Sequence, residues 1–377
     1  MTTATAPPLA PATGRLHHLD NLRVYLTFLV VAHHVALGYG NLGIWPNWEE
    51  PENAAGALPL DVFVLFNQAY TMGLFFLLSG AFAPPALDRR GPGPYARERL
   101  RRLGIPFLAF LILLRPLYTL PEYLGRPADE RGPYWQYYLT ESNIGPMWFV
   151  EVLLVFSLLY AWFRAVRPAP EPAPPQSLRP WHFAAFAVAL ALVSWVWRMA
   201  VPVGQFVPVL GLPSAAYLPQ YVAVFCLGAL AFRRGWLANL PRRAGLLGVG
   251  LILASLLAMA FSGYAALDLE DPPPAVSTAH LGFALWDSLF AVGAILILLR
   301  GFERFANGSG PLARFLSANA YGVYLVHAPV IVGAVALLAP VAAPPVVKFL
   351  LAFAVAAPVS WAATAALRRI PAVRSVL

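Results

Sequence analysis

Apolar residues in this chain come in long runs that are separated by short polar segments. Ten runs of roughly 18–22 residues carry almost no charge, and a helix of that length crosses the hydrocarbon core of a bilayer. The pattern therefore predicts an all-α, polytopic membrane protein with about ten transmembrane helices. The runs lie at about residues 22–40, 62–83, 104–120, 147–165, 182–200, 217–233, 244–264, 280–300, 315–338 and 345–367.

The composition supports a protein that lies in the lipid bilayer. Hydrophobic residues make up 59% of the chain and charged residues only 12%, whereas a soluble domain has about 25% charged residues. The net charge is +8, but the basic residues lie between the apolar runs, where they act as topology signals. Nucleic acid is therefore rejected as a partner. The single cysteine, Cys226, excludes an internal disulfide.

The charges between the runs predict the orientation of the chain. The segment before the first run and every second segment after it hold 21 of the 26 arginine and lysine residues. Basic segments stay on the cytoplasmic side, so both termini are expected in the cytoplasm of a multi-pass protein of the cell membrane. A span missed near the start would invert the alternation from that point on, so the alternation supports the count of ten.

We expect one membrane domain at residues 19–370 with a cytoplasmic tail at each end. Residues 1–18 are rich in alanine, proline and threonine and are read as a disordered tail, and residues 371–377 form the second tail. A proline-rich stretch at residues 167–180 is the main linker and separates the first four spans from the last six.

The first run contains polar residues at positions that a helix brings to one face. His34 follows Arg23 by eleven residues, which is three turns plus about 20° and about 16 Å along the axis. His33 points about 100° away from this stripe. A histidine in a membrane span is either a helix-interface residue or part of a site. Imidazole is well suited to general-base catalysis near neutral pH, so we favour a site at His34 with Arg23 on the same face.

The segment at residues 87–106, between the second and third runs, is strongly basic. Arginine binds phosphate through two parallel hydrogen bonds, so a phosphorylated cytoplasmic ligand is one interpretation. The other interpretation is that the arginines serve only as topology signals or bind anionic lipid headgroups. The arginines are Arg89, Arg90, Arg97, Arg99, Arg101 and Arg102.

Other charged residues fall inside apolar runs. Arg115 lies in the third run, Glu151 near the outer end of the fourth and Asp287 in the eighth. Because charges within membrane spans are usually paired, we favour an ion pair of Arg115 with Glu151 or Asp287. The alternative is that these residues line a pocket for the acceptor that is open to the outer side. His327 of the ninth run is a further candidate for that pocket. No metal site is predicted.

Five short motifs, in their order along the chain, resemble the acyltransferase-3 family of integral membrane acyltransferases. The resemblance, together with ten spans, covers nearly the whole chain. The motifs are Arg23-x10-His34, LFFLLSGAF at residues 74–82, Arg99-x-x-Arg102, GPMWFVEVLLVF at residues 145–156 and NAYGVYLVHAPV at residues 319–330.

This resemblance implies transfer of an acyl group, acetyl or succinyl, from cytoplasmic acyl-coenzyme A to a hydroxyl of a carbohydrate or glycoconjugate. His34 then corresponds to the essential histidine and Arg23 completes its motif. Arg99 and Arg102 correspond to the arginine pair that serves the coenzyme A phosphates. The first run further resembles the branch that includes glucan succinyltransferases. No permanently bound cofactor is implied.

A transporter or flippase of a polar or glycosylated substrate is the alternative from another class. It accounts for the buried charges, but not for the histidine stripe together with the basic segment. The sequence leaves open the acceptor, the acyl group, the oligomeric state, and whether an acyl-histidine intermediate forms.

Overall fold

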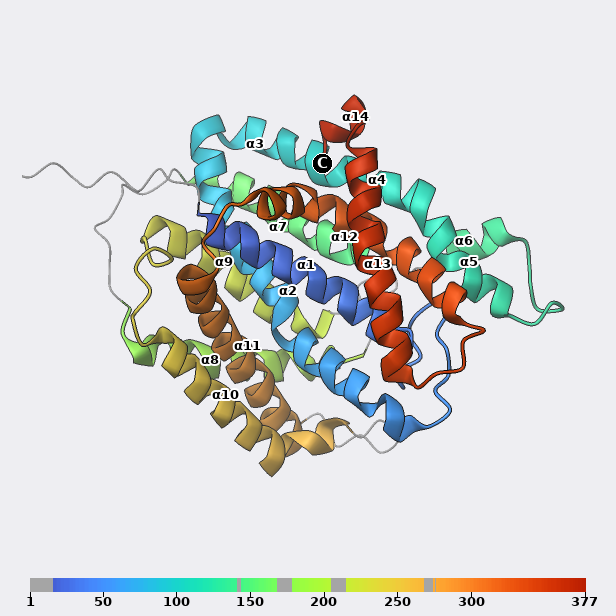
Figure 1. Ribbon diagram of the computed structural model, residues 1–377. Coiled ribbons are helices and arrows are strands. Elements are labelled where there is room, and N and C mark those ends of the chain that lie inside the picture. Colours follow the sequence, from blue (N-terminus) through green and yellow to red (C-terminus); the bar gives the residue numbers. More distant parts are fainter. Residues whose placement is uncertain (1–15, 141–143, 168–177, 205–214, 268–273, 275) are drawn as a thin grey trace, which may run out of the picture.

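The computed structural model describes residues 16–140, 144–167, 178–204, 215–267, 274 and 276–377. Its elements in these ranges are all helical (Figure 1). They are α1 His17–Leu37, α2 Ala54–Arg90, α3 Pro92–Arg99, η1 Leu100–Gly104, α4 Ile105–Ala109, η2 Phe110–Leu114, α5 Arg115–Gly125, α6 Tyr134–Thr140, η3 Gly145–Met147, α7 Trp148–Val166, α8 Pro180–Arg198, η4 Ala215–Tyr217, α9 Leu218–Arg233, α10 Ala244–Phe261, η5 Gly263–Leu267, α11 Thr278–Phe305, α12 Pro311–Leu338, α13 Pro345–Leu367 and α14 Pro371–Arg374.

The predicted class is confirmed, and the spans lie where the apolar runs place them. Within the described ranges, nine helical stretches are long and apolar enough to cross a membrane, and each contains most or all of one expected run. The remaining run forms α1, which has the length of a span at 21 residues. Polar residues such as Asp20, Arg23, His33 and His34 make it less apolar than the other nine.

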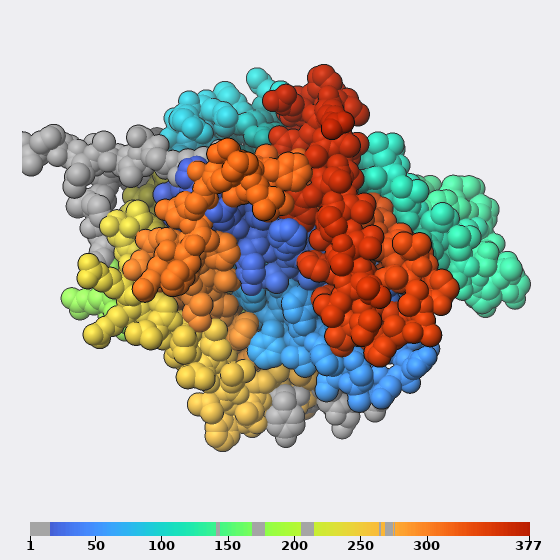
Figure 2. All heavy atoms as spheres, in the orientation of Figure 1, coloured from blue at the N-terminus to red at the C-terminus, as the bar shows by residue number. Residues whose placement is uncertain are grey.

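The position of α1 explains how so polar a helix can lie in the bundle. It packs against α2, α11, α12 and α13, and Leu22, Leu26 and Val31 are fully buried. In the space-filling view only part of α1 shows between the orange and red helices of the C-terminal part (Figure 2). The neighbouring helices thus shield the polar side chains of α1 from lipid, where their exposure would cost free energy.

Two glycines bring α2 and α9 into close contact. A Cβ on Gly80 would lie 2.1 Å from the Phe225 carbonyl oxygen, and one on Gly228 would lie 2.1 Å from the Leu77 carbonyl oxygen. Small residues allow such a backbone approach in membrane helices, where packing drives association. The crossing fixes α9 against the helix that lies beside α1.

Polar contacts join residues that the topology places on the same side of the membrane. Arg233 pairs with Asp88 at 3.0 Å, and both were expected in the cytoplasm. Lys348 pairs with Glu49 at 2.5 Å, and both were expected outside. These contacts agree with the order of the spans, while the orientation of the termini stays a prediction.

The basic segment is helical rather than a loop. After the turn at Gly91, α3 begins at Pro92 and runs through π-helical η1 into the third span. Helix α1 begins at His17, inside the expected first tail, and residues 371–374 of the expected second tail form α14. Arg101 donates to the Ser375 carbonyl at 2.7 Å, which ties the C-terminal end to the basic segment. Residues 1–15 and most of the proline-rich linker, residues 168–177, lie outside the described ranges.

Candidate active site

Arg23 and His34 lie on one uninterrupted helix, as the predicted stripe requires. Eleven residues of α1 separate them, which is about 16 Å along the axis. The Arg23 guanidinium is 41% exposed and lies 3.8 Å from the Asp20 carboxylate. The two ends of the stripe therefore differ: Arg23 is partly open near one end of α1, and His34 lies in its last turn.

His34 meets a second histidine, from α12. Its Nδ1 lies 3.1 Å from Nε2 of His327 and 2.9 Å from the Val30 carbonyl oxygen. His327 is fully buried. The structure thus places the weak candidate His327 directly beside the main candidate, although 293 positions separate them in the chain.

The surrounding carbonyls determine which nitrogens carry protons in the neutral pair. The Tyr324 carbonyl lies 2.7 Å from Nδ1 of His327 and can only accept, so this Nδ1 carries the hydrogen. Nε2 of His327 is then an acceptor, and Nδ1–H of His34 donates to it and to Val30. The lone pair of His34 is left on Nε2. His34 is only partly buried, and Nε2 has no recorded hydrogen bond to the described residues. That nitrogen is the free base of the pair.

His33 has different partners, as helical phase predicted. Its Nδ1 accepts from the Asn67 side-chain amide of α2 at 3.1 Å. The Asn67 Oδ1 in turn accepts from the Thr71 hydroxyl at 2.6 Å, which fixes the orientation of the amide. The two adjacent histidines therefore anchor α1 on two sides, His33 to α2 and His34 to α12.

Two aromatic residues complete the surroundings of His34, and sequence reasoning missed both. The Trp45 ring lies 5.3 Å from the His34 ring, between centroids. Tyr118 packs edge-on against Trp45 at 5.4 Å. Trp45 is 4% exposed, and its indole N–H is buried with no hydrogen-bond partner among the described residues. An unpaired buried donor next to a base is unusual. In the sequence it reads only as one of several tryptophans near a span end.

The arginine pair connects to the histidines through α12. The Tyr321 hydroxyl donates to the Arg102 carbonyl at 2.8 Å. The Tyr324 hydroxyl donates to the Pro146 carbonyl, and His327 follows one turn later. The guanidinium of Arg99 lies over the Tyr95 ring at 4.9 Å, and that of Arg102 lies 3.7 Å from Glu98 and is 46% exposed. Both arginines remain near the surface, and the Arg102 backbone contacts the same helix that carries His327.

One family of known proteins matches this chain over almost its whole length. The family described as acyltransferase domain, Acyl_transf_3, matches residues 16–365, which include both histidines and both arginines. The chain belongs to the acyltransferase-3 family. It is thus a membrane acyltransferase, and the resemblance inferred from the five motifs is confirmed.

Two relatives of this acyltransferase carry the same name. Glucans biosynthesis protein C of Salmonella typhi is 26% identical over 345 residues, which cover 84% of this chain and 82% of the relative. The protein of the same name from Salmonella paratyphi B is 25% identical over 342 residues, with the same coverage. No solved structure matches.

Arg115, Glu151 and Asp287 are the remaining charged candidates of the acyltransferase. Asp287 pairs with Arg198 of α8 at 2.7 Å, so an Arg115–Asp287 ion pair is wrong. The Arg115 guanidinium lies over the Tyr138 ring at 4.5 Å. Glu151 has one carboxylate oxygen buried without a hydrogen bond within the described residues. Arg198 is the last residue of α8 and was not a candidate, because its place near the end of the run at residues 182–200 does not show that it meets Asp287 of α11.

The Arg198–Asp287 pair is expected to stabilise the bundle. The two side chains are 4% and 1% exposed, so Asp287→Asn leaves a buried arginine without a counter-charge. Removal of one partner of a buried pair costs about 3–5 kcal/mol. Chemical unfolding of the purified protein in detergent measures the loss. Asp88→Asn is the control, because Asp88 is 42% exposed in its pair with Arg233 and such pairs contribute about 0–1 kcal/mol. Equal losses for the two variants would contradict the role of the buried pair.

Proposed function

We propose that this acyltransferase moves an acetyl or succinyl group from cytoplasmic acyl-coenzyme A to a hydroxyl of a carbohydrate, in the cell membrane. The observation that carries the proposal is the His34–His327 pair, which leaves His34 Nε2 free to act as a base. The carbohydrate acceptor rests on the relatives, which are named for glucan biosynthesis. Family membership favours this reaction over the transport alternative.

The base is His34, and His327 positions it. His34 Nε2 takes the proton of the acceptor hydroxyl while the oxygen attacks the thioester carbonyl carbon. The C–S bond then breaks, and His34 returns the proton to the leaving thiolate. During the step the positive charge on His34 is shared with His327 through Nδ1–H. This arrangement resembles catalytic triads, in which a third group orients the base.

The Trp45 indole N–H is the proposed donor to the developing oxyanion. An oxyanion site needs a donor that is fixed in place before the reaction and has no competing partner. Trp45 meets both conditions, because it is 4% exposed and its N–H is unpartnered among the described residues. Its ring packs on His34 from one side and on Tyr118 from the other.

Arg99 and Arg102 bind the phosphates of the donor in this proposal. Tyr321, which holds the Arg102 backbone, precedes His327 by six residues of α12, or about 9 Å along the axis. Coenzyme A has its charged end and its thioester at opposite ends of a flexible arm. A donor held at the arginines can therefore extend along α12 to the histidines.

Acyl-coenzyme A dependence tests the function. Acetyl- or succinyl-coenzyme A is expected to raise the melting temperature of the purified protein. The double replacement of Arg99 and Arg102 by alanine is expected to remove this shift and to raise KM for the donor by about tenfold or more, because a hydrogen bond to a charged group contributes about 1.5–3 kcal/mol. The Arg102 carbonyl that holds Tyr321 is retained in the variant.

Arg304→Ala is the matched control. Arg304 is an exposed arginine at the expected cytoplasmic end of α11, and its loss is expected to leave the thermal shift unchanged. If no acyl-coenzyme A stabilises the wild-type protein and none supports transfer, the proposed donor is wrong.

A further inference from the structure

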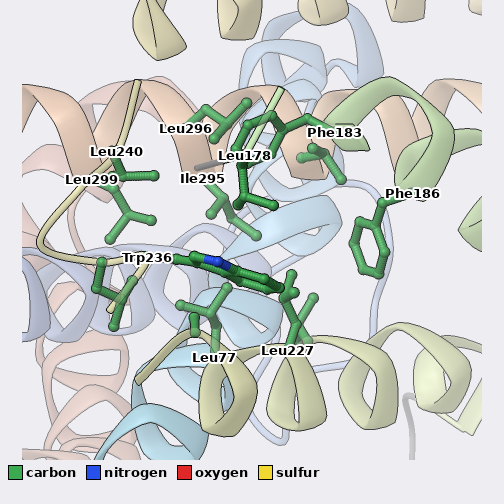
Figure 3. Close-up of a pocket in the computed structure, with 14 residues that line it drawn as sticks. Leu77, Leu178, Phe183, Phe186, Leu227, Trp236, Leu240, Ile295, Leu296 and Leu299 are labelled. Carbon is green, nitrogen blue, oxygen red and sulfur yellow. The ribbon is translucent and has the colours of Figure 1, made fainter. Parts of the chain in front are cut away.

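A cavity lies away from the histidines, between α2, α8, α9 and α11 (Figure 3). Its volume is about 60 Å³, and its lining is apolar apart from the Trp236 indole N–H, which is buried without a hydrogen-bond partner among the described residues. One water needs roughly 10–15 Å³ of such space and two to four polar partners, whereas cavities lined by apolar groups take up apolar molecules. A hydrocarbon chain of several carbons is the ligand class that fits. The cavity is lined by Leu77, Leu178, Phe183, Phe186, Val224, Leu227, Ala231, Trp236, Leu237, Leu240, Val292, Ile295, Leu296 and Leu299.

The cavity lies toward the ends of these helices that are expected to face the cytoplasm. Phe183 is near the start of α8, Ala231 near the end of α9 and Leu299 near the end of α11. Trp236 and Leu240 belong to the segment between α9 and α10, and the Trp236 indole extends toward the middle of the apolar side chains (Figure 3). The cavity is therefore at the level of the inner leaflet of the bilayer.

The cavity is separate from the candidate active site. On α2, the histidines are at the level of Asn67, whereas the cavity begins at Leu77. Ten residues of helix separate the two levels, which is about 15 Å. The group that occupies the cavity is therefore not the reacting acyl group.

Arginines flank the lining residues along the chain. Arg179 follows Leu178, Arg234 precedes Trp236 by two positions, and Arg242 and Arg243 come shortly after Leu240. Neither residues 178–186 nor residues 231–243 contain an acidic residue. In the part of the chain that the structure describes, no hydrogen bond or ion pair is recorded for the side chains of Arg234, Arg242 and Arg243. Their charge is available to an external anion.

We propose that this cavity binds an anionic phospholipid of the inner leaflet, with part of one acyl chain among the leucines and the phosphate at Arg234, Arg242 and Arg243. Basic pockets between membrane helices on the cytoplasmic side bind such headgroups, and arginine binds phosphate through paired hydrogen bonds. Charge complementarity selects an anionic lipid over a zwitterionic one. The inference does not depend on the acyl transfer reaction.

Lipid retention by the full chain tests this proposal. The purified protein is mixed with phosphatidylglycerol or with phosphatidylcholine that has the same acyl chains. Retained lipid is then counted by native mass spectrometry, and the melting temperature is measured in parallel. Phosphatidylglycerol is expected to be retained and to raise the melting temperature, whereas phosphatidylcholine is not. Acetyl-coenzyme A is not expected to displace the lipid.

Two sets of variants separate the cavity from the charges. Leu296→Trp fills the cavity, and the milder Leu227→Phe serves if the first variant does not fold; both are expected to abolish retention. Arg234→Ala and Arg242→Ala are expected to weaken it by about fivefold each, because an arginine near the surface contributes about 1 kcal/mol. The controls are Leu337→Trp, at a site that is 67% exposed on α12, and Arg314→Ala at the start of α12.

Three results would overturn the proposal. The first is equal retention of the two lipids. The second is unchanged phosphatidylglycerol binding when the cavity is filled. The third is a wild-type protein that retains no lipid, combined with a Leu227→Phe variant of unchanged stability. The cavity is then empty or is filled by the chain itself.

Discussion

Replacement of His34 by glutamine lowers kcat for acyl transfer by about 10²- to 10⁴-fold, the range that general acid–base catalysis contributes. Glutamine can keep a hydrogen bond to the Val30 carbonyl or to His327, which lie 2.9 Å and 3.1 Å from Nδ1 in the native protein. It supplies no base at the position of Nε2. Transfer from radiolabelled acyl-coenzyme A to a glucan, measured at saturating donor, gives the change. The donor-induced thermal shift is expected to remain, because the arginines are intact.

The neighbouring histidine provides the matched control. His33→Gln is expected to reduce stability through its contact with Asn67, but to change kcat far less than His34→Gln does. His327→Gln is expected to lie between the two, because the glutamine oxygen can still accept from His34 Nδ1–H but cannot share the positive charge as the His327 imidazole does. A folded His34→Gln protein with near-native kcat would remove His34 from the mechanism.

Replacement of Trp45 by phenylalanine lowers kcat by about 10²- to 10³-fold, as the loss of one oxyanion donor does in other acyl-transfer enzymes. Phenylalanine keeps an aromatic ring against His34 and Tyr118 and removes only the unpartnered N–H. Because the donor acts on charge that develops in the transition state, KM for acyl-coenzyme A is expected to change little. Steady-state kinetics that resolve kcat from KM provide the measurement.

Trp48 lies in the same segment and tests whether the effect is specific. Its indole N–H donates to the Gly40 carbonyl at 2.6 Å, so its role is to hold the chain after α1. Trp48→Phe is expected to lower the melting temperature with little change in kcat. If Trp45→Phe behaves in the same way as Trp48→Phe, Trp45 is a packing residue and the oxyanion donor lies elsewhere.

Much of the fold follows from the sequence because the bilayer imposes one rule on every span. Each span must satisfy its own backbone and present apolar side chains over about 20 residues. Single runs such as residues 244–264 therefore predict α10 closely. Helical phase also separates His33 from His34, and their different partners on α2 and α12 confirm that prediction.

The neighbours of each span could not be predicted in the same way. Periodicity gives the face on which a residue lies, but not the helix that meets that face. Asp287 shows this limit, because its partner proved to be Arg198 rather than Arg115. For the same reason His327 remained a weak candidate until α12 was seen beside α1, and Asn67 and Trp45 were not candidates at all.

The central position of α1 has a consequence for the order in which the protein is made. The ribosome synthesises α1 first among the spans, yet two of the helices that cover it, α12 and α13, are the last. Roughly 270 residues separate the end of α1 from the start of α12, which is about 15–55 s of synthesis at typical rates. Throughout this interval His34 lacks its partner His327 of α12. The nascent chain must therefore hold its most polar span in the membrane, beside α2, until translation is nearly complete.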